Sequence, residues 1–141
     1  MTRERTAFIV YDRDHALAVA TVSAEMGTPV RLYSPSHGAA ALGADVFQAI
    51  VSEARDAFPE ADLSAVLDCG DEPGTALGAI RHGIEAISLA AEPDVRHRVA
   101  DIAAQSGTKI VGRATEALDM SGSTDPAGDI RTWISKMGAL D

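Results

Sequence analysis

The 141-residue chain has little of several things that would define its class. It has one cysteine, so no disulfide can form within the chain, and it lacks the Cys/His spacings of zinc sites. Aromatic residues make up only 4% of the sequence. No stretch approaches the roughly 18 apolar residues of a membrane span, and no apolar signal-peptide segment follows the first residues. We therefore expect a cytoplasmic protein that does not enter a membrane.

Positive charge is also scarce. The chain has 12 Lys and Arg against 21 Asp and Glu, which gives a formal net charge of −9. Nucleic-acid phosphates and anionic membrane surfaces are bound by a surplus of basic side chains on one face. We therefore expect neither nucleic acid nor a membrane surface as a partner.

Apolar residues make up 46% of the sequence, and most of them are small or aliphatic. They gather in short runs that are typical of strands buried on both faces of a parallel sheet. The expected strands are 7–11, 30–33, a run around 65–67, 86–89 and 109–111. Because no linker or low-complexity tract interrupts the pattern, residues 1–141 are predicted to form one domain.

Helix-like segments lie between these runs, with apolar residues at three- and four-residue steps and with Gly or Pro at their ends. Asp12 or Asp14 can cap the first helix, and the longest pattern ends at Pro59. The expected helices are about 15–26, 39–58, 74–82, 93–106 and 126–140.

Alternation of strands and helices predicts an α/β fold with helical crossovers between parallel strands. The first choice is a three-layer α-β-α domain with a five-stranded, mostly parallel sheet in the flavodoxin-like order 2-1-3-4-5. The alternative is part of a (β/α) barrel. Both architectures place ligand sites at the carboxyl ends of the strands.

The segment 120–141 is a Gly/Ser-containing loop followed by the last helix. That helix carries an apolar stripe formed by Ile130, Trp133, Ile134 and Met137. The stripe can pack on the chain's own sheet or against a second copy, so a homo-oligomer formed through this helix is one expectation.

Polar residues follow three of the expected strands, and in the 2-1-3-4-5 order their loops meet at one edge. The candidate ligand-site residues are Asp12, Asp14, His15, Ser36, His37, Asp68, Cys69, Asp71 and Glu72, to which later loops can add Glu92 and Arg113. Converging carboxylates suit Mg²⁺, with Asp12, Asp14 and Asp68 as ligands, or a carboxylic acid with a raised pKa. Alternatively, these residues only cap helices, as Ser36 can cap the helix after it.

Cys69 has two interpretations. It can act as a nucleophile, with His15 or His37 as its base. It can also be a small buried residue at a strand end, because its acidic neighbours oppose thiolate formation.

Asp12 after the first strand, Asp68 after the third and the Pro73-Gly74 turn together resemble a response-regulator receiver domain. The resemblance implies that Asp68 accepts a phosphoryl group and that Asp12 and Asp14 help to hold Mg²⁺. The chain departs from the family pattern because Arg13 separates the two aspartates, Ser88 lies inside the fourth strand, and Gly112-Arg113 stands where a lysine is needed.

Neither GxGxxG nor GxxxxGK[ST] occurs, and no catalytic motif is complete. We therefore expect a non-enzymatic binding or regulatory module without a cofactor. The alternatives are an enzyme that uses the Asp12, Asp14, Asp68 and Asp71 edge, with Mg²⁺ or by acid/base chemistry, and a degenerate receiver-like domain.

Overall fold

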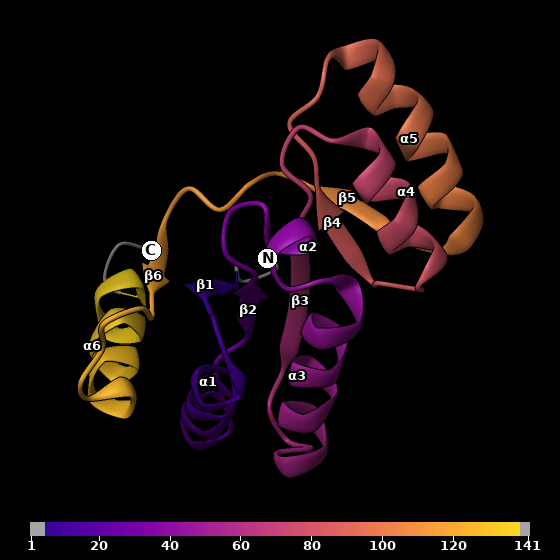
Figure 1. Ribbon diagram of the computed structural model, residues 1–141. Coiled ribbons are helices and arrows are strands. Elements are labelled where there is room, and N and C mark those ends of the chain that lie inside the picture. Colours follow the sequence, from indigo (N-terminus) through magenta and orange to yellow (C-terminus); the bar gives the residue numbers. More distant parts are fainter. Residues whose placement is uncertain (1–4, 139–141) are drawn as a thin grey trace. The chain divides into compact units, whose positions relative to one another are not determined.

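Residues 5–138, which are the residues that the computed structural model describes, contain six strands and six helices in the order β1-α1-β2-α2-α3-β3-α4-β4-α5-β5-β6-α6 (Figure 1). Their Cα atoms cluster into two units. The first comprises Met1–Leu32, Ile50–Ser64 and Glu116–Asp141, and the second comprises Tyr33–Ala49 and Ala65–Thr115.

The first unit contains β1 (Thr6–Ile9), which pairs in parallel with β6 (Ala117–Asp119), so that Ile9 lies opposite Asp119. On its other side β1 neighbours β2 (Val30–Tyr33), and β2 neighbours β3 (Leu63–Asp68). The Val30 amide donates to the Asp62 carbonyl at 2.9 Å, at the start of the β2–β3 contact.

Two helices of the first unit, α1 (Arg13–Met26) and α6 (Pro126–Gly138), pack against each other. Ile130 and Ile134 of α6 are buried, and the Trp133 Nε1–H donates to the Ala7 carbonyl at 3.2 Å. Within the first unit, the apolar stripe of the last helix is therefore used at least in part for packing inside the chain.

The second unit holds β3, β4 (Ala86–Ser88) and β5 (Lys109–Val111), which pair in parallel in that order. The register sets Asp68 opposite Ser88 and Ser88 opposite Val111. The last residues of three strands therefore lie in one row, and the loops that follow them leave the sheet at the same edge.

Three helices belong wholly to the second unit, namely α2 (Gly38–Ala41), α4 (Pro73–Arg81) and α5 (Pro93–Ser106). Helix α4 packs against both α5 and α2. Its buried face consists of Ala76, Ala79 and Ile80. The two alanines on this face let the helices approach closely.

The predicted class, an α/β protein with a parallel sheet flanked by helices, is confirmed, with six strands rather than five. The additional strand is β6, a short segment of Ala117, Leu118 and Asp119. Its sequence has no run of β-branched residues, and it becomes a strand because it pairs with the edge of β1.

The predicted strand order 2-1-3-4-5 is wrong. In the first unit β2 lies between β1 and β3, and in the second β3, β4 and β5 are consecutive neighbours. Sequential neighbours are also the order in a (β/α) barrel. From β1 to β5 the strands follow one another in one direction, and only β6 returns to the other side of β1, so no switch point forms between β1 and β3.

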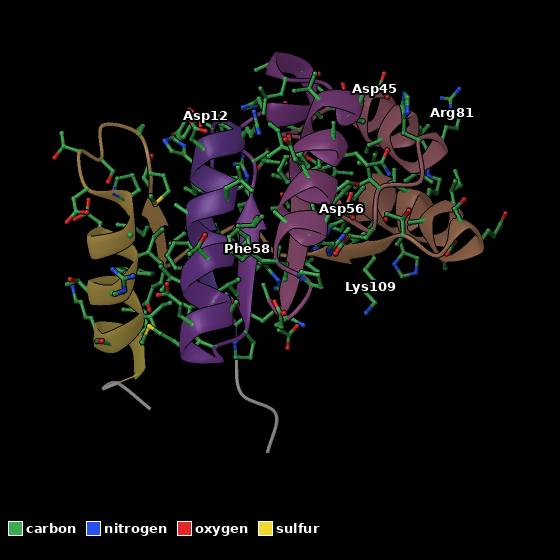
Figure 2. All side chains as sticks on the ribbon, turned by 90° about the horizontal axis from the view of Figure 1, so that it is seen from below. Asp12, Asp45, Asp56, Phe58, Arg81 and Lys109 are labelled. Atoms are coloured by element: carbon green, nitrogen blue, oxygen red, sulfur yellow. The ribbon has the colours of Figure 1, made fainter. Side chains whose placement is uncertain are left out.

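The helix predicted over 39–58 is two helices, α2 and α3 (Ala44–Ala57). Gly43 separates them with φ +88, a left-handed conformation that an α-helix cannot contain. Helix α1 is capped at its start by Asp12, whose Oδ1 accepts the amide of His15 at 2.9 Å. Figure 2 shows Asp12 at the end of α1.

Among residues 5–138, no helix is both long enough and apolar enough to cross a bilayer.

Candidate functional site

The carboxylate of Asp68, at the end of β3 in the second unit, is the centre of a hydrogen-bonded cluster. Only 6% of the residue is exposed. Its Oδ1 accepts the backbone amides of Gly70 at 2.7 Å and His37 at 3.1 Å, and its Oδ2 accepts the Ser88 hydroxyl at 3.2 Å. Residues that follow β2, end β3 and end β4 therefore meet on one carboxylate.

Arg113, two residues beyond β5, completes the cluster. Its Nε donates to Oδ2 of Asp68 at 3.1 Å and its Nη2 donates to Oδ1 at 3.3 Å, which is a forked, bidentate contact. The same Nη2 donates to the Ser36 hydroxyl at 3.1 Å. The Arg113 side chain remains 42% exposed, so part of its guanidinium faces solvent.

We name these residues the Asp68 cluster: Ser34, Ser36, His37, Asp68, Gly70, Ser88 and Arg113. Ser34 belongs to it because its hydroxyl accepts the backbone amide of Asp68 at 2.8 Å. Asp68 itself accepts five hydrogen bonds, and an ionised carboxylate has about four lone-pair positions. No position is left for a proton or a metal ion without breaking a bond that is already made.

The pKa of Asp68 follows from this geometry. Burial alone raises the pKa of the carboxyl group, because it disfavours the charged form. The hydrogen bond from Arg113, the amides of His37 and Gly70, and the positive charge of Arg113 outweigh burial and lower the pKa below its ordinary value. The same pairing raises the pKa of Arg113. Near neutral pH the pair is therefore a carboxylate and a guanidinium.

His37 has an unusual backbone conformation, with φ +58 in a residue that is not glycine. Such a conformation costs on the order of 1–3 kcal/mol and persists only where the surroundings impose it. Here the amide of His37 is held by Asp68. A Cβ on Gly70 would clash with the His37 ring, so the ring lies directly over Gly70.

The His37 side chain is 52% exposed and has two polar neighbours. Its Nδ1 lies 3.3 Å from the Ser36 hydroxyl, and its Nε2 lies 3.9 Å from Asp71. The cluster therefore presents to solvent the Ser36 hydroxyl, the His37 imidazole and part of the Arg113 guanidinium. The loops that carry these groups are held in place by hydrogen bonds to Asp68 or to Arg113.

The structure brings together five of the residues named from the sequence: Ser36, His37, Asp68, Asp71 and Arg113. Glu72 is nearby in sequence but has another role, because it accepts the Thr75 hydroxyl at 2.8 Å at the start of α4. Ser36 does not cap the following helix: its hydroxyl binds Arg113, and the cap position is taken by His37 without a side-chain bond.

Cys69 is next to Asp68 but faces the interior. It is 2% exposed, and its Sγ lies 3.8 Å from the Leu67 carbonyl. Burial, and then the negative charge of Asp68, raise the pKa of the thiol to about 12. A thiol with this pKa is protonated at neutral pH, so the environment favours the buried interpretation over the nucleophilic one.

Asp12, Asp14 and His15 belong to the first unit. His15 accepts the Tyr11 amide on its Nδ1 at 3.0 Å, and the Tyr11 hydroxyl donates to Asp119 at 2.9 Å. Burial, and then the bond to Asp119, raise the pKa of Tyr11. Across residues 5–138, no group of three or more His, Cys, Asp or Glu side chains is arranged to hold a metal ion.

The principal partners of Asp68 include two residues, Arg113 and Ser88, whose contacts are not evident from the sequence. Arg113 was expected only as an additional member of the edge, yet it is the principal partner of Asp68. Ser88 was placed inside a strand, yet as the last residue of β4 its hydroxyl reaches Asp68. The usable signal was their position, since each ends or follows a strand that neighbours β3 or β4.

No protein-family model matches this chain, and a search of curated proteins finds no match. The geometry of the second unit is consequently the basis for the function proposed below.

Proposed function

We propose that this chain is a non-enzymatic binding module, and that the Asp68 cluster of the second unit is its ligand site. The observation that carries the proposal is the saturation of Asp68. A catalytic carboxylate needs a free lone pair or an exchangeable proton, whereas Asp68 accepts five hydrogen bonds. Its role is to hold the loops in place.

The groups that the cluster exposes determine the ligand. Arg113 points a half-exposed guanidinium outward while Asp68 fixes its orientation. The Ser36 hydroxyl and the His37 imidazole lie beside it. A prepositioned guanidinium loses little conformational entropy on binding and recognises planar or tetrahedral oxyanions. The proposed ligand is a small molecule that contacts Arg113 through an anionic oxygen group.

A receiver-like reaction is the second candidate, and one observation favours it. A hydroxyl from the fourth strand and a basic side chain after the fifth both contact Asp68, as the resemblance requires, with Ser88 and Arg113 in these places. The strand order opposes it, because β2 lies between β1 and β3 in the first unit.

The test compares the melting temperatures of wild type and of Arg113→Gln with inorganic phosphate, acetate and Mg²⁺. A ligand of the folded state raises the melting temperature by mass action. We expect an increase with phosphate or acetate in the wild type and none in Arg113→Gln. Arg96→Gln, which removes an exposed charge from α5 in the same unit, serves as the matched control and should respond like the wild type.

Two results would overturn the binding proposal. One is an equal response of Arg113→Gln and wild type to every anion. The other is an increase with Mg²⁺ that disappears in Asp68→Asn, together with the mass of one added phosphoryl group after incubation with acetyl phosphate. That second result would establish the receiver-like reaction instead.

A further inference from the structure

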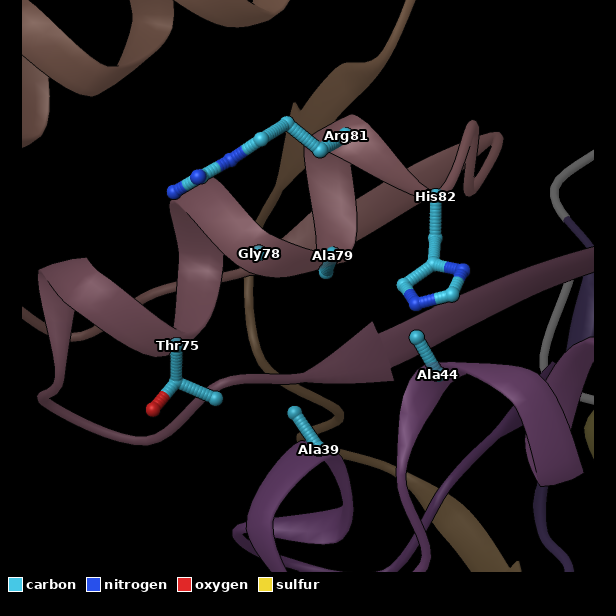
Figure 3. Close-up of a pocket in the computed structure, with 7 residues that line it drawn as sticks. All are labelled: Ala39, Ala44, Thr75, Gly78, Ala79, Arg81 and His82. Carbon is cyan, nitrogen blue, oxygen red and sulfur yellow. The ribbon is translucent and has the colours of Figure 1, made fainter.

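The second unit also contains a cavity of about 470 Å³ that is separate from the residues of the Asp68 cluster. It lies between α4 and the segment formed by α2 and the start of α3 (Figure 3). Small-molecule sites commonly have volumes of roughly 300–1,000 Å³. The lining residues are Ala39, Ala44, Thr75, Gly78, Ala79, Arg81 and His82.

Four of the seven lining residues are alanine or glycine: Ala39, Ala44, Gly78 and Ala79. Gly78 is the most informative of them. It lies inside helix α4, where glycine costs roughly 0.5–1 kcal/mol relative to alanine. A Cβ at this position would meet no atom within 4 Å. The packing of the chain therefore does not require glycine at this position. The effect of having no side chain at Gly78 is to leave more empty space in the cavity beside α4.

The lining has an unusual charge for this chain. The whole sequence has a formal net charge of −9, yet the seven lining residues include one guanidinium and one imidazole and no carboxylate. His82 is compensated, because its Nδ1 lies 2.8 Å from Asp45. Arg81 has no acidic partner among residues 5–138, and its Nε donates only to the Leu77 carbonyl at 3.4 Å.

Size, lining and charge point to one class of ligand. Alanine methyl groups and the glycine surface favour a compact apolar body, and the uncompensated guanidinium favours a single anionic group. We propose that this cavity binds a small organic monoanion, a carboxylate on a compact apolar or aromatic body. Figure 3 shows the Arg81 side chain along the side of α4 away from Ala39 and Ala44, so its guanidinium turns toward the cavity to contact the carboxylate. This site is independent of Arg113 and of the function proposed for the Asp68 cluster.

The experiment uses the full chain with ¹³C-labelled alanine methyl groups and two probes of the same shape, benzoate and benzyl alcohol. The methyl signals of Ala39, Ala44 and Ala79 report occupancy directly. We expect benzoate to shift all three signals in a saturable way, with a dissociation constant of about 1 mM or below. We expect benzyl alcohol to bind about tenfold more weakly, because it lacks the charge.

Four variants separate the parts of the proposal. Gly78→Leu fills the cavity and, since leucine favours helix, should fold and lose benzoate binding. Gly74→Leu adds the same side chain to the same helix outside the lining and should bind like the wild type. Arg81→Gln should bind benzoate and benzyl alcohol equally weakly, whereas Arg98→Gln on α5 should change neither.

The proposal is overturned if benzoate at concentrations well above the expected dissociation constant leaves the three methyl signals unchanged. It is also overturned if Gly78→Leu binds benzoate as the wild type does. Equal loss in Arg81→Gln and Arg98→Gln would likewise contradict it, because only the net charge would then matter. Arg113→Gln leaves this cavity intact, so benzoate binding by that variant distinguishes the cavity from the Asp68 cluster.

Discussion

The two units place carboxylates at the ends of parallel strands, but they use them differently. Asp68 in the second unit is 6% exposed and receives five hydrogen bonds, including a bidentate contact from Arg113. Asp12 and Asp119 in the first unit are exposed and have fewer partners: Asp12 caps α1, and Asp119 accepts the Tyr11 hydroxyl and the Ser121 amide. An aspartate after a parallel strand therefore connects four segments of the chain in the second unit, where it is Asp68. Asp12 and Asp119 in the first unit each connect only one or two segments.

The physical reason for the difference is the depth at which each carboxylate ends its strand. Asp68 lies opposite Ser88 on the neighbouring strand, inside the sheet, where an unpaired charge would be costly. Asp119 ends β6, which has β1 as its neighbour and lies at the edge of the sheet in the first unit. Because Asp68 is buried, its charge must be compensated by hydrogen bonds and by Arg113. The residues that supply these bonds lie on the loops of the candidate site or at the end of β4.

The largest expected effect is that of Asp68→Asn. The substitution removes the charge that pairs with Arg113 and turns an amide NH₂ toward groups that donate hydrogen bonds. We expect a loss of about 3 kcal/mol in the free energy of unfolding. Urea denaturation followed by far-UV circular dichroism measures it, and amide hydrogen exchange at His37 and Gly70 should accelerate. A loss no greater than that of Asp12→Ala would remove the contrast between the two units.

Acid should reveal the same difference. The pKa of Asp68 is lowered in the folded protein, so its contribution is fully present above the ordinary Asp value of about 3.9. That contribution is lost as the pH falls through the lowered folded-state pKa. We expect wild-type stability to fall more steeply than that of Asp68→Asn below about pH 4. Parallel acid limbs for the two proteins in urea denaturation would show that Asp68 is not the responsible group.

A smaller effect is expected at the first unit. Asp12→Ala removes the side-chain acceptor that caps α1, and such a loss costs about 1 kcal/mol. Asp14→Ala, in the first turn of the same helix, should cost less than about 0.5 kcal/mol because it contributes only through the helix dipole. Urea denaturation monitored by Trp133 fluorescence reports on this unit. Equal losses for the two variants would mean that Asp12 does not act as a cap.

Much of the secondary structure was predictable from local pattern. The apolar runs, Gly27 and Gly107 after their helices, and Pro93 and Pro126 at helix starts all act within a few residues of themselves. The break at Gly43 was missed because the apolar period continues through it, although glycine in the sequence was a usable signal. Strand β6 has no signal of its own, because it depends on the edge of β1.

The candidate site was predictable only in part. Position after a strand selected Ser36, His37, Asp68 and Asp71, which lie close together in the second unit, and their role as a ligand site stays a prediction. The strand order decides which loops are neighbours, and the sequence does not encode it in any short segment. The expected convergence of Asp12 with Asp68 depended on β1 lying beside β3, and with β2 between them that topological basis is missing.

The sequence by itself determined the α/β class, most element positions and the acidic character, because these depend on composition and on contacts between near neighbours. Tertiary structure alone decided that Arg113 and Ser88 meet at Asp68, that Cys69 faces inward, and that Gly78 opens a cavity beside Arg81. Each of these outcomes depends on how elements that are distant in the chain pair or pack, and that information exists only in the folded structure.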